Sequence, residues 1–201
     1  METFKYGDTE LDYLKMKDEK LAHLIEQHGM IERKVTPDLF TALINSVVSQ
    51  QISTKAAATV WNRLIQHLGE ISPQIIANAT VEEIQQCGLS TRKANYIKGI
   101  GDAVVNGELQ LDEFPKLSDQ EVIDRLSSLH GIGVWTAEML LIFSMQRSDI
   151  ISWGDLGIRR GLTRLYALED LTKEQFNEYK KRYSPYGSVA SLYIWKLGNN
   201  K

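Results

Sequence analysis

Apolar side chains recur at helical spacing along nearly the whole chain. In residues 38–48 they share one face of a helix with about 3.6 residues per turn. These residues are Phe40, Leu43, Ile44, Val47 and Val48. No segment shows the sustained alternation of apolar and polar residues, bounded by turn signals, that is typical of a strand. The pattern therefore predicts an all-α fold of roughly nine or ten short helices.

Short polar residues mark where most of these helices begin, because their side chains accept hydrogen bonds from the free N–H groups of a first turn. The predicted start signals are Ser53, Ser72 with Pro73, Thr80 with Glu83, Ser90, Ser118 with Glu121, Thr172 with Gln175, and Ser184 with Pro185. The last of these predicts a final helix that ends near Leu197. Many capped helices joined by short loops favour a compact globule over a solenoid or a coiled coil.

The length of 201 residues suits one large domain or two small lobes. Hydrophobic residues make up 43% and charged residues 24%, as in ordinary globular proteins. No apolar run approaches the roughly 18 residues of a membrane span. The first residues, METFKYGDTELDYLK, are acidic and polar, so we expect neither a secretory signal nor a transit peptide. The chain is therefore expected to be intracellular, in the cytoplasm or nucleoid, or in the nucleus of a eukaryote.

Cys87 is the single cysteine, which excludes an intramolecular disulfide, a zinc site built from cysteines and a four-cysteine iron–sulfur cluster. The histidines show no ligand-like spacing, so a metalloenzyme is not predicted. The formal net charge of −3 argues mildly against nucleic acid as a partner. However, a protein that binds phosphates through backbone N–H groups and helix N-termini needs few lysines.

The most informative segment is residues 121–145, where two apolar helices flank Gly131-Ile132-Gly133. Two glycines spaced by one residue allow a tight turn, with the second helix beginning near Trp135. The N–H groups at that helix start and the helix dipole form an anion site, for which a DNA phosphate is one occupant. Ile132 is expected to pack into the core. The alternative is an ordinary helical hairpin with a glycine turn.

The pattern L-x-G-I-G-x-W-T-A resembles the helix-hairpin-helix motif of the HhH-GPD superfamily of DNA glycosylases. The resemblance covers residues 38–197, and within the superfamily the chain looks like the 3-methyladenine (alkylbase) DNA glycosylases. The passages that carry this similarity are residues 43–64, 88–105, 138–150 and 184–197.

The resemblance implies a two-lobed, all-α fold with the helix-hairpin-helix motif at the cleft between the lobes. Residues 38–144 would form a helical-barrel lobe that ends in the hairpin. Residues 1–37 and 145–201 would form the second lobe. Residues 1–37 are too few for the N-terminal β-domain that some relatives carry.

In this superfamily an aspartate follows the hairpin by about 20 residues, at the start of the next helix, and Asp155 occupies that place. The resemblance implies that Asp155 is catalytic. An ionised carboxylate stabilises the positive sugar formed when an N-glycosidic bond breaks, and it orients or deprotonates the attacking water. The alternative for Asp155 is a plain N-cap. Relatives commonly have a proline and a further aspartate just before it, where this chain has Trp153-Gly154.

Trp135 stands where superfamily members that also cut the DNA backbone carry a lysine for Schiff-base attack. The resemblance therefore implies a monofunctional glycosylase that acts on alkylated purines of the 3-methyladenine and 7-methylguanine class, with water as the nucleophile. An electron-rich pocket would favour a cationic base by stacking and cation–π contact. The candidates for its lining, each with core packing as the alternative, are Trp135, Met139, Trp153 and Tyr186.

A flipped base leaves a gap in duplex DNA that the protein must fill. In the family the filling residue lies in the turn after the first core helix, where Gln51 aligns best and Ile52 is its neighbour. The alternative is a solvated turn. The basic residues expected at phosphates, with solvated charge as the alternative, are Lys55, Arg92, Lys93, Arg159 and Arg160.

The resemblance also implies a monovalent cation, Na⁺ or K⁺, held at the hairpin by the backbone carbonyls of Ser127, Leu129 and Ile132. No other cofactor is expected. The expected partner is duplex DNA with a damaged base, bound by a monomer. Two other functions stay open: a non-catalytic helix-hairpin-helix DNA-binding module, and a sibling glycosylase for another lesion such as oxidised guanine or uracil.

Overall fold

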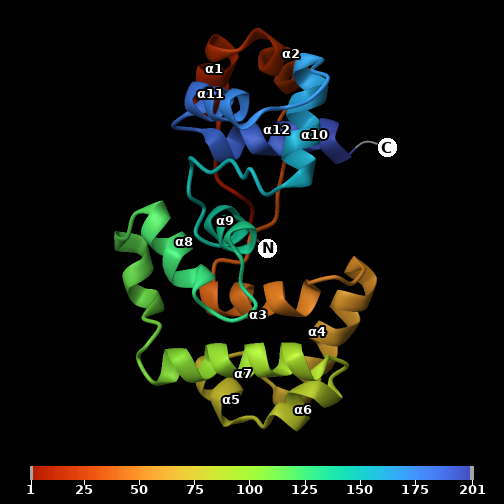
Figure 1. The fold of residues 1–201 in the computed structure, drawn as a ribbon, viewed down its shortest axis with the longest axis vertical. Helices are drawn as coiled ribbons and strands as arrows, with labels where there is room; N and C mark the ends of the chain where they lie inside the picture. The colour runs from red at the N-terminus through yellow and green to blue at the C-terminus, as the bar shows by residue number, and fades with distance from the viewer. Residues whose placement is uncertain (1, 200–201) are drawn as a thin grey trace. The chain divides into compact units, whose positions relative to one another are not determined.

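The computed structural model describes residues 2–199 (Figure 1). Over this range the chain forms twelve α-helices, α1–α12, and one 3₁₀ helix, η1. The β pairing found in these residues is an isolated antiparallel bridge between Thr3 and Lys34. The predicted all-α fold is confirmed, with more helices than expected. None of the described helices is long and apolar enough to cross a membrane.

Three of these helices were not among those predicted from the apolar pattern. They are α1 (Asp8–Lys17), α2 (Glu19–His28) and η1 (Leu111–Lys116). In α1 only Leu11 and Leu14 are buried, so its amphipathic signal is faint. A helix of this kind depends on tertiary contacts more than on its own periodicity. Helix α2, by contrast, buries Leu21, Leu24 and Ile25 on one face.

Contacts between residues divide the chain into two units. Unit 1 comprises Met1–Val35 and Leu141–Lys201, and unit 2 comprises Thr36–Leu140. The helices of unit 2, besides η1, are α3 (Leu39–Ser49), α4 (Thr54–Leu68), α5 (Pro73–Asn78), α6 (Val81–Gln86), α7 (Thr91–Val105), α8 (Asp119–Ser127) and the first part of α9 (Val134–Phe143). The remaining helices of unit 1 are α10 (Leu156–Tyr166), α11 (Lys173–Tyr183) and α12 (Gly187–Asn199).

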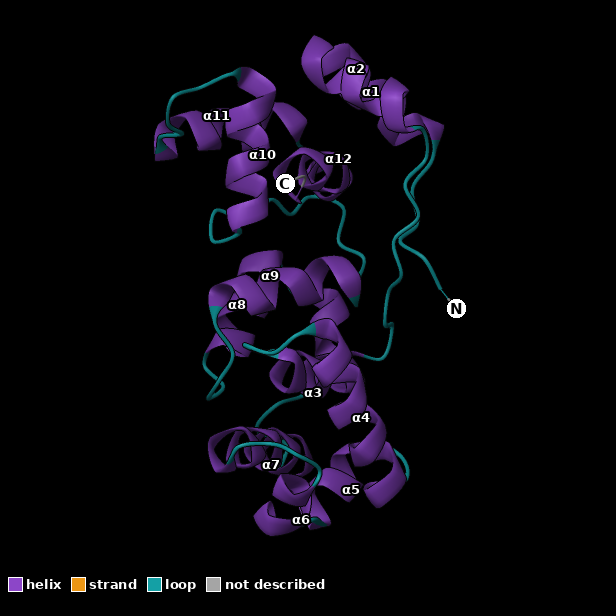
Figure 2. Cartoon of the chain, turned by 90° about the vertical axis from the view of Figure 1, so that its right-hand side faces the viewer, coloured by secondary structure: helices purple, strands orange, loops and turns teal. Residues whose placement is uncertain are grey.

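Helix α7 is central to unit 2, where it packs against α3, α5 and α6 (Figure 2). Large, fully buried apolar side chains come from most helices of this unit and include Leu43, Ile44, Leu64, Ile76, Ile84, Ile97 and Phe114. On the longer helices the buried side chains recur at helical spacing, as Ala57, Val60 and Leu64 do on α4, so such a helix presents one apolar stripe to the core.

Polar residues begin the helices as predicted at six positions, where the side chain accepts a hydrogen bond from the first turn that follows. These are Ser53, Ser72, Thr80, Ser90, Ser118 and Thr172. The prediction was wrong at Ser184, since α12 begins at Gly187. Ser184 instead ends α11, with its N–H bonded to the carbonyl of Lys180, and its hydroxyl is bonded to Asp149. A serine before a proline therefore closed one helix rather than opening the next.

In unit 1, α10 and α12 lie side by side and approach each other at glycines (Figure 1). A Cβ on Gly161 would overlap the carbonyl oxygen of Ile194. A Cβ on Gly198 would overlap the carbonyl of Gly157. Glycine is required at these positions because no side chain fits between the two backbones. This close approach fixes the start of α10 against the face of α12.

A buried polar network ties α2 to α10 and α11 around Asp18, which is 7% exposed. The carboxylate accepts hydrogen bonds from the Leu21 N–H (2.9 Å), the Tyr166 hydroxyl (2.5 Å) and the Arg182 guanidinium (2.6 Å). Burial by itself raises the pKa of Asp18, but the three hydrogen bonds outweigh burial and hold that pKa below its ordinary value. Asp18 is therefore ionised at neutral pH and stabilises the fold.

Candidate active site and nucleic-acid interface

Asp155 lies at the start of α10, and two hydrogen bonds fix its carboxylate. Its Oδ1 accepts one from the Ile158 N–H at 2.9 Å and one from the Trp195 indole N–H at 3.0 Å. The residue is 9% exposed. The first bond is an ordinary N-cap, but the second comes from a different helix. Asp155 is therefore held by more contacts than a helix cap needs.

The loop that leads to Asp155 is bonded at its first residues to Ser184 and to α12. The Asp149 carboxylate accepts the Ser184 hydroxyl at 2.6 Å. The Ile150 N–H donates to the Ser188 hydroxyl oxygen at 2.9 Å, and the Ser191 hydroxyl donates to the Ile150 carbonyl at 3.2 Å. Ser188 and Ser191 are fully buried, so these bonds are shielded from water. The beginning of the loop is thereby fixed against α12.

Trp195 is the residue of this site that the sequence reasoning missed. With Ser188 and Ser191 it lies on one face of α12, at helical spacing in an otherwise apolar helix. That face bonds both the loop and Asp155. Polar groups repeated on one face of an apolar helix were the signal that could have found it, because buried polar groups need partners.

Trp153 is half-buried in unit 1, where its ring contacts other side chains of the same unit. Its ring meets Phe176 edge to face, with centroids 5.1 Å apart. The Lys173 ammonium and the Arg159 guanidinium lie 4.6 and 5.4 Å from its centroid. Two cations of the chain thus already engage the electron-rich ring. A role for Trp153 in a base pocket stays a prediction.

The other predicted pocket residues are distributed between the two units. In unit 1, Tyr186 is half-buried and its ring meets Tyr13 edge to face at 5.1 Å. In unit 2, Trp135 is 47% exposed on the first turn of α9. Met139 lies one turn later on the same helix face and is half-buried. Their assembly into one pocket with Trp153 stays a prediction.

The hairpin joins α8 to α9 through a turn closed by the Ile132 N–H, which donates to the Leu129 carbonyl at 3.1 Å. Gly131 has φ +87°, and a Cβ there would overlap the ring of Tyr96. Ile132 is 4% exposed and packs into the core as expected. At Gly133, by contrast, a Cβ would meet nothing within 4 Å. The fold therefore requires glycine at 131. At Gly133 it leaves free space beside the backbone, where a ligand can approach the start of α9.

The two glutamines of the α3–α4 turn differ in their surroundings. The Gln50 side chain donates to the Gly131 carbonyl at 2.8 Å, so it ties this turn to the hairpin. Gln51 is exposed and has φ +57°. Ile52 is 41% exposed. Gln51 and Ile52 were predicted from the sequence, whereas the role of Gln50 was not.

The predicted phosphate-contacting residues differ in their surroundings. Lys55, Arg92 and Arg160 are exposed. Arg159 is half-buried against Trp153. Lys93 donates to two backbone carbonyls of its own unit, so it has a structural role beside any contact with phosphate.

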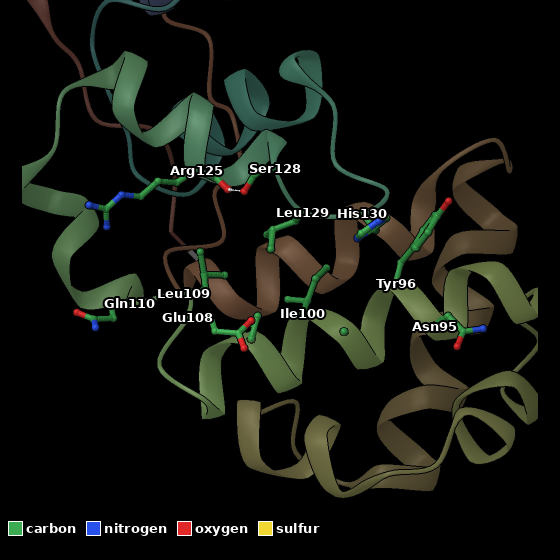
Figure 3. A pocket seen from close by; sticks show the side chains of 12 residues that line it. Asn95, Tyr96, Ile100, Glu108, Leu109, Gln110, Arg125, Ser128, Leu129 and His130 are labelled. Atoms are coloured by element: carbon green, nitrogen blue, oxygen red, sulfur yellow. Dashed lines mark hydrogen bonds between the residues drawn. The ribbon is translucent and has the colours of Figure 1, made fainter.

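A cavity of about 670 Å³ lies in unit 2 between α7, the end of α8 and the hairpin (Figure 3). Its floor is apolar and its rim carries the polar side chains of Asn95, Glu108, Gln110 and His130. None of the four residues predicted to line the base pocket borders this cavity.

Residues 44–185 match the family described as HhH-GPD superfamily base excision DNA repair protein. The chain belongs to this superfamily. It is 37% identical over 162 residues to DNA-3-methyladenine glycosylase 1 of Schizosaccharomyces pombe. The aligned region covers 78% of this chain and 71% of that relative.

Two solved structures show the same fold. The crystal structure of DNA-3-methyladenine glycosidase from Bacillus halodurans has a TM-score of 0.88 and 33% identity, covering 100% of this chain and 94% of that one. The S. pombe 3-methyladenine DNA glycosylase Mag1 in complex with abasic DNA has a TM-score of 0.80 and 32% identity, covering 94% and 96% of the two chains. The HhH-GPD fold expected from the hairpin is confirmed.

Proposed function

We propose that the chain is a monofunctional DNA glycosylase that hydrolyses the N-glycosidic bond of alkylated purines in duplex DNA and leaves an abasic site. The observation that carries the proposal is the carboxylate of Asp155, held at the start of α10 by Ile158 and Trp195. Relatives named as DNA-3-methyladenine glycosylases support the substrate class. A relative solved with abasic DNA supports duplex DNA as the partner and an abasic site as the product.

In the proposed reaction the bond between C1′ and the purine nitrogen breaks, and its electron pair leaves with the base. An alkylated purine is cationic, so that pair neutralises it and no strong general acid is needed. Asp155 stabilises the oxocarbenium-like sugar and orients the water. The water oxygen then bonds to C1′, and its proton passes by way of Asp155 to solvent. Position 135 holds tryptophan rather than a nucleophilic lysine, which supports hydrolysis without strand cleavage.

We propose that the hairpin binds a DNA phosphate at the start of α9. The first-turn N–H groups of a helix have no partners within that helix, and the dipole favours an anion there. Gly133 leaves room for close approach, since nothing in the chain occupies the place of a Cβ. The damaged base would be flipped out of the stack, and Gln51 and Ile52, both exposed, are proposed to fill the gap.

The end of α8 suits the monovalent cation expected from the family. The helix ends at Ser127, so its last carbonyls lie at the negative end of a helix dipole. Leu129 contributes a carbonyl that already accepts the Ile132 N–H, and a second lone pair is left for a cation. Ser127, Leu129 and Ile132 are the proposed donors, and a bound cation would supply positive charge near the phosphate.

The test compares two helix caps. Asp155→Asn should lower base release from alkylated DNA by about a hundred- to a thousandfold and leave duplex binding intact, because Asn caps a helix as well as Asp but carries no charge. Asp38, which caps α3 through the Thr41 N–H at 2.7 Å, provides the matched control Asp38→Asn, which should keep full activity. The released bases are identified by chromatography.

The outcomes separate the open functions. Release of 3-methyladenine or 7-methylguanine by the wild type establishes the substrate class. Binding without release from any damaged duplex would favour the non-catalytic module, and release of oxidised guanine or uracil alone would favour a sibling glycosylase. If Asp155→Asn is as active as Asp38→Asn, Asp155 is only a helix cap.

A further inference from the structure

Lys93 occupies an unusual place for a lysine on a protein expected to bind DNA. It lies on the first turn of α7 and is half-buried. Its ammonium donates to the Val48 carbonyl at 2.8 Å and to the Gln50 carbonyl at 2.6 Å. Both acceptors lie at the end of α3, where carbonyls have no partner within the helix and a cation complements the dipole.

The turn that Lys93 bonds is also held on its other side and is strained. The Gln50 side chain donates to the Gly131 carbonyl at 2.8 Å, which links the turn to the hairpin. The next residue, Gln51, has φ +57°, in a left-handed conformation that non-glycine residues rarely adopt. Such a conformation persists only where the surrounding contacts impose it. Lys93 and Gln50 provide those contacts. Lys93 binds the main-chain carbonyls of Val48 and Gln50, just before Gln51, and the Gln50 side chain binds the hairpin.

We propose that Lys93 is a positioning residue that holds the α3–α4 turn in the one conformation that presents Gln51 and Ile52 to the gap left by a flipped nucleotide. This inference rests on the proposed function. Two of the three N–H donors of the ammonium are committed to carbonyls of the chain, so Lys93 acts through the turn rather than as a free phosphate contact.

The cost of placing an ammonium there supports a specific role. Burial, and secondarily the neighbouring Arg92, lower the pKa of Lys93. A neutral polar side chain could cap carbonyls without that cost. An ammonium, unlike a neutral side chain, also complements the negative end of the α3 dipole.

The same helix offers a matched control. Lys98 donates to the Ala77 carbonyl at 2.5 Å and to the Asp102 carboxylate at 2.7 Å. It therefore caps the end of α5 as Lys93 caps α3, but it touches neither the turn nor the hairpin. Lys93→Met and Lys98→Met each remove one half-buried ammonium from α7, and only the first releases the α3–α4 turn.

The experiment measures kcat/KM for release of a single 7-methylguanine from two duplexes. In one the lesion is opposite cytosine, and in the other it is opposite an abasic-site analogue, where the pair is already broken and the gap needs less filling. Lys93→Met should lose about tenfold or more on the paired lesion, since a small misplacement of a positioning group is costly, and about twofold or less on the unpaired one. Lys98→Met should match the wild type on both, and Lys93→Arg should recover most of the paired activity.

A binding readout tests the turn without chemistry. In the Asp155→Asn background, 2-aminopurine placed beside the lesion brightens when the stack opens, and addition of Lys93→Met should reduce that signal at saturating protein. Equal losses on both duplexes, an equal loss in Lys98→Met, or an unchanged Lys93→Met would overturn the inference while the proposed function stands. A wild type that releases no base from either duplex, and no 3-methyladenine from alkylated DNA, would overturn the proposed function itself.

Discussion

Replacing Trp195 by phenylalanine removes one donor from Asp155 and keeps an aromatic ring beside Phe143. The indole N–H lies 3.0 Å from Oδ1 of Asp155, and the rings of Trp195 and Phe143 are 5.6 Å apart between centroids. A hydrogen bond to a charged group contributes about 1.5–3 kcal/mol. If that stabilisation serves the orientation of the carboxylate, its loss corresponds to about a ten- to hundredfold fall in rate, at roughly 1.4 kcal/mol per factor of ten.

The lower end of this range is the expected result, because the Ile158 N–H at 2.9 Å still holds the same oxygen. Single-turnover base release should therefore fall about tenfold in Trp195→Phe, while KM for duplex DNA changes little. Trp61→Phe, at a half-buried tryptophan of unit 2, is the control for loss of an indole. Thermal unfolding of both variants measures the stability lost with ring volume. A Trp195→Phe enzyme with the wild-type rate would refute a role for the indole in orienting Asp155.

Two further predictions concern stability and DNA binding. Asp18→Asn should lower the free energy of unfolding by about 2–4 kcal/mol, because it leaves Arg182 without its buried charge partner. The folded-state pKa of Asp18 lies below its ordinary value of 3.8, so its stabilisation is present above that pH and is lost as the pH falls through the folded-state pKa. Urea unfolding should thus show a shallower acid dependence in Asp18→Asn, and equal slopes would contradict the network. Gly131→Ala should lower Tm, since φ is +87° and Tyr96 fills the space. Gly133→Ala should keep Tm but weaken duplex binding about tenfold in a fluorescence-anisotropy titration, as a Cβ meets only the approaching phosphate; unchanged binding would place the phosphate elsewhere.

Short-range features of the chain were predictable from the sequence. Helical periodicity, six helix caps and the Gly131 turn each depend on residues within a few positions of one another. The same holds for Asp155, whose place at the start of a helix is local chemistry. The hairpin pattern suggested the family, which the match over residues 44–185 shows.

Long-range partners were decided by the tertiary structure. Trp195 donates to Asp155 from 40 residues away, and Gln50 reaches Gly131 across 81. No local pattern encodes such pairs, because they depend on how closely α10 and α12 approach at their glycines and on how α3 lies against α7. Lys93 illustrates the limit: a basic residue predicted for phosphate is bonded to the carbonyls of Val48 and Gln50. Sequence supplied the charged groups, and packing decided which buried partners they would satisfy.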